Sequence, residues 1–126
     1  MSFSNYLETE ILDHVFGGAA YTAPSTLYVA LYTATPNDAG GGTELSGSGY
    51  TRKSAAFTTS GATTSNSGAI EYDTATGSWG TITHIGVFDA ATSGNLMAYG
   101  ALSSSKAVDT GDVFRIPAGD LDITLN

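Results

Sequence analysis

The pattern of hydrophobic and polar positions is clearest between residues 79 and 102, where two β-rich runs flank a short polar connection. The first run, Thr81 to Phe88, holds Thr, Ile and Val, whose branched side chains favour strands. The second run, Asn95 to Leu102, carries leucine, methionine and tyrosine. The connection, residues 89–94, contains an aspartate and a glycine, which are typical of turns. The pattern predicts a β-hairpin with a longer loop.

Apolar residues lie on both faces of the first strand of this predicted hairpin. By strict alternation one face carries Ile82, His84, Gly86 and Phe88, and the other face carries Ile85 and Val87. A strand with one solvated face alternates more cleanly, so we expect this strand to be covered on both sides in a packed sandwich. The run from Thr26 to Thr33 shows the same two-sided pattern and predicts a second covered strand.

Helical periodicity is convincing only in residues 4–17. The apolar stripe recurs at helical spacing and consists of Leu7, Ile11, Leu12 and Val15. Ser4 or Asn5 can cap the start of the helix, where Glu8 forms a variant of the capping box. The pair Gly17-Gly18 ends the helix.

The rest of the chain predicts shorter strands separated by polar turns. These strands are Gly49–Phe57, Ala69–Tyr72, Lys106–Val108, Val113–Ile116 and Leu121–Leu125, the last with Leu121, Ile123 and Leu125 facing inward. Loops are predicted at Asn37–Gly49 and Thr58–Ser67, and a turn at Ser103–Ser105. About eight short strands and one short N-terminal helix predict a mainly β fold, as an antiparallel β-sandwich or jelly-roll-like barrel. The length of 126 residues predicts a single domain over residues 1–126.

The charge balance of the sequence limits the classes of binding partner that we expect. The net charge is −8, from 12 acidic and 4 basic residues, which argues against binding of nucleic acid or of an anionic membrane. Two interpretations remain: solubility through self-repulsion, or a partner whose surface is basic. Arg52 and Lys53 are interpreted as internal salt-bridge partners, with a docking patch as the alternative. The sequence has no cysteine, signal peptide or membrane-spanning run, so we expect a soluble protein made in a cytoplasm.

Candidate chemistry is sparse. His14 and His84 lie far apart in the chain without a zinc-ligand spacing, and no catalytic triad pattern occurs. The late aspartates could hold calcium but lack the spacing of a calcium loop, so turn and surface roles explain them better: Asp109, Asp112, Asp120 and Asp122. Trp79 is interpreted as a plug of the core or its rim, with an interface hot spot as the alternative. We therefore predict no catalytic, metal-binding or cofactor-binding residue, no cofactor and no enzyme activity.

Several segments together resemble a family of small virion proteins of tailed bacteriophages. These segments are Asn5–His14 with Gly17-Gly18, Leu27–Ala34, Trp79–His84 with Gly86–Asp89, Gly94–Leu96, and Ile116–Leu121. The similarity spans nearly the whole chain, with gaps at the loops that contain Gly40 and Thr58. The resemblance implies a structural component of the virion, made in the host cytoplasm, and carries over no functional site.

Three functions stay open, and the first is the one that we favour from the resemblance and the lack of candidate chemistry. The first is a capsid cement or decoration protein that contacts the major capsid protein or other virion proteins, usually as a homo-trimer, with the N-terminal helix available for docking on a partner. The second is a component associated with the tail fibre or baseplate. The third, from another class, is a glycan-binding or glycan-processing module, since paired carboxylates are defined only in space.

Overall fold

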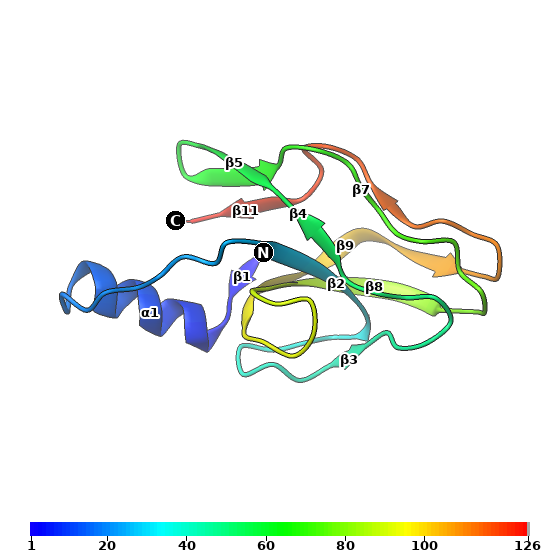
Figure 1. Cartoon of the computed structure of the whole chain (residues 1–126), viewed down its shortest axis with the longest axis horizontal. Helices are drawn as coiled ribbons and strands as arrows, with labels where there is room; N and C mark the ends of the chain where they lie inside the picture. The colour runs from blue at the N-terminus through cyan, green and yellow to red at the C-terminus, as the bar shows by residue number, and fades with distance from the viewer. Residues whose placement is uncertain (126) are drawn as a thin grey trace.

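The computed structural model describes residues 1–125 and is mainly β, with antiparallel sheets and one helix (Figure 1). The elements in chain order are β1 (Ser2–Phe3), α1 (Asn5–Val15), β2 (Leu27–Ala34), β3 (Thr43–Glu44), β4 (Lys53–Ala55), β5 (Phe57–Ser60), β6 (Thr63–Asn66), β7 (Ile70–Glu71), β8 (Gly80–Phe88), β9 (Leu96–Val108), β10 (Arg115–Ile116) and β11 (Asp122–Thr124). The mainly β class and the N-terminal helix are thus confirmed.

The main sheet is built around the predicted hairpin. Its strand order is β1-β9-β8-β2-β3, and β4 also pairs with β2. Strands β8 and β9 pair antiparallel, with Ile85 opposite Gly100 and Val87 opposite Ala98. On its other edge β8 pairs antiparallel with β2, so the predicted hairpin supplies the central strand of the sheet. The hairpin and the central position of its first strand are confirmed.

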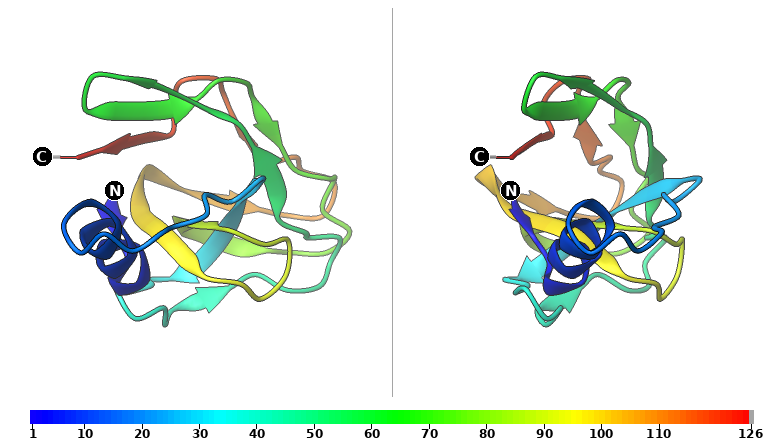
Figure 2. Two further views of the ribbon diagram at one scale, coloured as in Figure 1. Left: turned by 60° about the vertical axis from the view of Figure 1, so that its left-hand side comes forward. Right: turned by 90° about the vertical axis from the view of Figure 1, so that its left-hand side faces the viewer.

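Two smaller sheets form a second layer. One contains β10 and β7, and the other has the order β11-β6-β5. Figure 2 shows this layer standing over one face of the main sheet. The sheets stay separate and do not close on one another, so the expectation of a barrel was wrong. Several of the strands are only two residues long, which is too short to continue hydrogen bonding around a closed circuit.

The main core fills the space between the two layers. It contains Val29 and Leu31 of β2, and it extends to Ile116 of β10 and Leu121 before β11. A smaller cluster covers the opposite face of β2 and includes Ala30 and Tyr32. Strand β2 is therefore buried on both faces, as its alternating apolar pattern predicted.

Strand β9 differs from the prediction because it continues through Ser103–Ser105, where we expected a turn. Its pairing with β8 is interrupted: Ile82 lies opposite Lys106, whereas His84 lies opposite Ala101. The exposed serines lie in the extra length of β9 at this irregularity, and the strand continues past them. The same irregularity breaks the strict alternation of side chains along β8. Ile82 packs in the same core cluster as Ile85, and the prediction that Ile82 shares a face with Phe88 was wrong.

The segment Thr58–Ser67 was wrongly predicted as a loop and forms most of the β5–β6 hairpin. Its two strands pair from Phe57–Asn66 to Ser60–Thr63, and the tight turn uses Gly61 at φ +61°. Threonine has high strand propensity even where the surface is polar, and the Thr59 hydroxyl donates to the Thr64 hydroxyl at 3.0 Å. A hairpin of polar residues lacks the apolar alternation on which the prediction relied.

The remaining differences are local. The predicted strand Gly49–Phe57 begins its pairing only at Lys53 and breaks at Ala56, and the predicted loop Asn37–Gly49 contains the short strand β3. At the C-terminal end Leu121 is buried but Leu125 is 56% exposed, so the expectation that Leu125 faces inward was wrong. Leu125 follows the last paired residue of β11, beyond the edge of the main core.

The helix α1 is anchored at its N-terminal end. Ser4 is the N-cap, and its hydroxyl accepts a hydrogen bond from the Leu7 backbone N–H at 3.2 Å. The same hydroxyl donates to the Leu96 carbonyl, and the Ser4 backbone N–H donates to the Met97 carbonyl at 2.9 Å. Ser4 therefore joins the start of the helix to β9, while the rest of the helix extends away from the sheets (Figure 1).

Candidate interaction site

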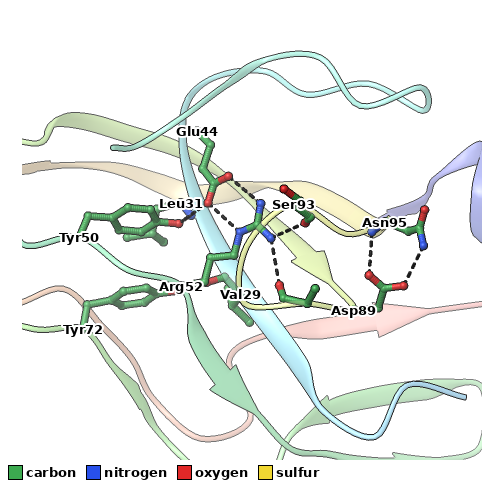
Figure 3. Close-up of polar contacts among 10 residues, drawn as sticks. Val29, Leu31, Glu44, Tyr50, Arg52, Tyr72, Asp89, Ser93 and Asn95 are labelled. Carbon is green, nitrogen blue, oxygen red and sulfur yellow. Dashed lines mark hydrogen bonds and ion pairs between the residues drawn. The ribbon is translucent and has the colours of Figure 1, made fainter. Parts of the chain in front are cut away.

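A charged network holds three segments of the chain together around Arg52 (Figure 3). Its guanidinium donates from Nε and Nη2 to the two carboxylate oxygens of Glu44, both at 2.8 Å. Nη1 donates to the backbone carbonyls of Ala90 at 3.0 Å and Ser93 at 2.8 Å. The guanidinium carbon also lies 3.7 Å from the centre of the Phe88 ring. Arg52 thereby links β3 to the loop of the central hairpin.

The two adjacent basic residues are both internal ion-pair partners, as interpreted from the sequence. The Arg52 side chain is 8% exposed and that of Glu44 is 26% exposed. Lys53 Nζ lies 2.9 Å from the Asp73 carboxylate, and that pair is far more open to solvent. A bidentate pair between shielded groups is stronger than a single exposed contact. The two pairs therefore differ in the stability that they supply.

Three tyrosine hydroxyls near this network are kept protonated by their surroundings. Burial raises the pKa of Tyr50, and its hydroxyl donates to Glu44 at 2.7 Å while accepting from the Leu31 N–H at 3.1 Å. Burial also raises the pKa of Tyr72, whose hydroxyl donates to the Val29 carbonyl at 2.7 Å. The pKa of Tyr32 is raised to about 12, chiefly by burial. Tyr50 and Tyr72 therefore act as hydrogen-bond donors within the fold.

Trp79 lies in the aromatic part of the core. It is 4% exposed, and its ring meets those of Tyr50 and Tyr72 edge to face at centroid distances of 5.8 and 6.5 Å. Its Nε1 donates to the Ser48 carbonyl at 2.8 Å. The interpretation of Trp79 as a core plug is confirmed.

Asp89 organises the loop of the central hairpin. Its carboxylate accepts from the Asn95 backbone N–H at 2.7 Å and from the Asn95 side-chain amide at 2.9 Å. Desolvation alone would raise the pKa of Asp89, but these hydrogen bonds and the field of Arg52 together lower it below the ordinary value of 3.8. The carboxylate is therefore committed to closing the loop.

Acidification should weaken the fold partly through Asp89. Its pKa is lower in the folded than in the unfolded chain, so its stabilisation is complete above the unfolded pKa near 3.8 and is lost as pH falls through the folded value. We expect Asp89→Asn to lose less Tm than the wild type between roughly pH 5 and pH 3. Thermal melts at stepped pH measure this, with the exposed Glu71→Gln as a control of equal charge change. An equal loss of Tm on acidification in Asp89→Asn and in the wild type would show that protonation of Asp89 does not weaken the fold.

The other residues considered from the sequence do not converge. The His14 ring contacts the Ala19 carbonyl at 2.9 Å, and His84 contacts the neighbouring Thr83 hydroxyl at 2.8 Å. The Asp112 carboxylate accepts from the Asp109 backbone N–H at 2.9 Å, and Asp122 bonds to the Ser65 hydroxyl. Within residues 1–125 no three His, Asp or Glu side chains are placed to share a metal ion. The Asp112 carboxylate therefore closes a turn, and Asp122 supports the pairing of β11 with β6.

A groove of about 460 Å³ lies where β9 faces β10 and β11. Its lining is mixed and includes the apolar Ile85, Leu102 and Phe114 together with the charged Lys106 and Asp120. Strand β1 pairs with β9 only at Ala98 and Tyr99, so the outer edge of β9 beyond these residues has no strand partner among the described residues. This groove and edge offer a surface for contact with another chain.

A second exposed surface lies at the far end of α1. Among the described residues five large apolar side chains are strongly exposed, and three of them belong to this end: Leu12, Val15 and Phe16. We call these three residues the helix patch. No residue of α1 is buried, although an apolar stripe of this kind normally faces a core. The sequence showed Leu12 and Val15 as part of the stripe but gave no sign that they would be solvent-exposed, and it passed over Phe16.

Within the described chain no helix has the length and apolar character needed to cross a membrane. The fold and its polar contacts define a small β-rich scaffold whose ionisable groups hold loops and strands in place. A family model described as podophage GP4 fiber I protein gp80 matches residues 2–124, and the chain belongs to that family. It is therefore a small structural protein of the bacteriophage virion, as the resemblance implied. No curated protein matches the chain.

Proposed function

We propose that the protein is a component of the tail fibre or of the adjoining baseplate region, and that it acts through protein–protein contacts. The observation that carries this proposal is the match of residues 2–124 to a family named for a podophage fibre protein. Capsid cement, the first function considered from the sequence, has no comparable support. The alternative fibre function fits the family better.

The structure supports a structural rather than catalytic role. In the more shielded of the two ion pairs, Arg52 with Glu44, the guanidinium also donates to carbonyls of the hairpin loop within the same chain. Asp89 and the buried Tyr72 are similarly committed to internal partners. A network whose hydrogen bonds are all made inside the chain stiffens the protein, as a component of a virion appendage requires. It also leaves few polar groups available for catalysis.

We further propose that the chain folds as one domain, an open sandwich, and associates with copies of itself as well as with other virion proteins. One core cluster runs from Val29 to Leu121, which favours a single folding unit. The uncovered outer edge of β9 favours strand pairing between copies, and a trimer is the expected state.

The location in the particle tests the fibre proposal. Gold-labelled antibody against the protein should mark the tail end of purified particles, and quantitative gel analysis should give few copies relative to the major capsid protein. Labelling over the whole shell at high copy number would overturn the fibre proposal in favour of capsid cement. Turnover of host polysaccharide that disappears when a single carboxylate is changed would instead favour the glycan-processing alternative.

A further inference from the structure

The helix patch is exposed and stands away from the sheets. Leu12 is 57% exposed, Val15 60% and Phe16 81%. Helix α1 packs against β1 and β9, and its C-terminal end points outward from the body of the molecule in both Figure 1 and Figure 2. The half-buried residues of the helix are Tyr6, Leu7, Glu10 and Ile11, whereas Leu12 to Phe16 are all exposed. The patch is therefore a second apolar face that the described chain leaves uncovered.

The spacing of the patch suits a groove on a partner. Leu12 and Val15 are three residues apart on α1, and Phe16 follows as the C-cap with its backbone still in the αR region, so the three side chains gather within one turn at the end of the helix. Amphipathic helices that bind in grooves present their anchor residues at these intervals. A large exposed aromatic beside two aliphatic residues is also typical of a binding anchor. The three residues thus have the character and the spacing of side chains that insert into an apolar groove.

The charge around the patch identifies the kind of partner. Helix α1 carries Glu8 in its first turn, Glu10 and Asp13 beyond it and His14 in its last turn, and the chain has no Lys or Arg before Arg52. A second copy that met this patch with its own α1 would bring the same acidic residues against Glu8, Glu10 and Asp13, so self-association is disfavoured at the helix. An anionic lipid surface would be repelled for the same reason. A groove rimmed by Lys or Arg would complement both the apolar patch and the acidic residues along the helix.

We propose that the exposed end of α1 docks into an apolar groove, rimmed by basic residues, on another protein of the virion. The inference rests on the proposed function as a fibre component and names the element through which the protein is attached. The apolar residues supply the affinity, whereas the acidic residues orient the helix and speed the encounter. The sheets then remain free to contact copies of the same chain.

Phage carrying variants of this gene test the proposal. Purified particles should contain about tenfold fewer copies of Leu12→Ser/Phe16→Ser than of the wild type, relative to the major capsid protein. The matched control is Val113→Ser/Leu125→Ser, which removes two exposed apolar side chains elsewhere and should leave the copy number unchanged. The level of each variant in the lysate and its Tm after purification establish that it is made and folded.

A second pair of variants tests the charge. Glu8→Gln/Asp13→Asn should reduce incorporation several-fold, whereas Glu71→Gln/Asp109→Asn, with the same charge change at exposed residues outside α1, should not. With particles that lack the protein, rebinding of the purified wild type should weaken as NaCl is raised, because salt screens the acidic–basic contact. These measurements decide the question even if the serine variant fails to fold.

Three results would overturn the proposal. The first is normal incorporation of both the serine and the charge-removing variants. The second is rebinding that does not respond to salt. The third is sedimentation that shows the wild type self-associating through the patch, so that Leu12→Ser/Phe16→Ser dissociates it. The fibre proposal is judged separately, since labelling of wild-type particles locates the protein whatever the helix variants do.

Discussion

Replacing Arg52 by methionine should lower the free energy of unfolding by about 3 kcal/mol, at the lower end of the range for removing one partner of a shielded ion pair. The change leaves the Glu44 carboxylate without its bidentate partner and two carbonyls of the hairpin loop without their donor. It also removes the cation from the Phe88 ring. For a chain of this size the Tm should fall by roughly 10 °C. Denaturant titration followed by far-UV circular dichroism measures the effect.

The neighbouring Lys53 provides the matched control. Lys53→Met breaks a single contact to Asp73 in an exposed pair, so it should cost about 1 kcal/mol or less. The double variant Arg52→Met/Glu44→Gln should lose much less free energy of unfolding than the sum of the losses in the two single variants, because each single change already breaks the pair. Similar losses for Arg52→Met and Lys53→Met would show that the Arg52 network is not the stronger one.

Removing the Trp79 side chain should destabilise the fold at least as much as the loss of Arg52. Trp79→Ala takes a side chain that is 4% exposed out of the aromatic cluster with Tyr50 and Tyr72. Truncation of a buried tryptophan typically costs about 3–5 kcal/mol, as lost transfer energy and as a cavity. Because Trp79 is the only tryptophan, circular dichroism must replace intrinsic tryptophan fluorescence as the probe.

Trp79→Phe separates packing from hydrogen bonding. Phenylalanine keeps most of the aromatic contact but cannot donate to the Ser48 carbonyl. We expect a loss of about 1–2 kcal/mol for the hydrogen bond and the smaller ring. If Trp79→Ala were no more destabilising than Trp79→Phe, the ring would contribute little to the core, which would contradict its placement.

The sequence predicted those elements whose apolar pattern was strong. Strands β2 and β8 carry long apolar runs on both faces, and both lie centrally in the main sheet. The β5–β6 hairpin was missed because its Thr and Ser residues stabilise one another through pairing, without an apolar face to reveal it. The irregularity in β9 was missed because the shift opposite Ile82 depends on the partner strand, which local propensity does not describe.

The polar network was predicted only in part. The internal role of Arg52 followed from its rarity in an acidic chain, but its partner Glu44 lay in a segment expected to be a flexible loop. The carbonyls of Ala90 and Ser93 are about forty residues away in sequence and carry no side-chain signal. The exposed face of α1 was also beyond prediction, since periodicity shows that a helix is amphipathic but not whether its apolar face is covered.

The anchoring of residues 89–94 by Arg52 should protect this loop from proteolysis outside the host cell. Proteases cut exposed loops that can be drawn out into an extended conformation, and hairpin tips are their usual targets. Here the tip is tied at Ala90 and Ser93 by the guanidinium and at Asn95 by Asp89. Cleavage would first require these ties to open together, so the segment should resist digestion by the extracellular proteases that a released phage meets.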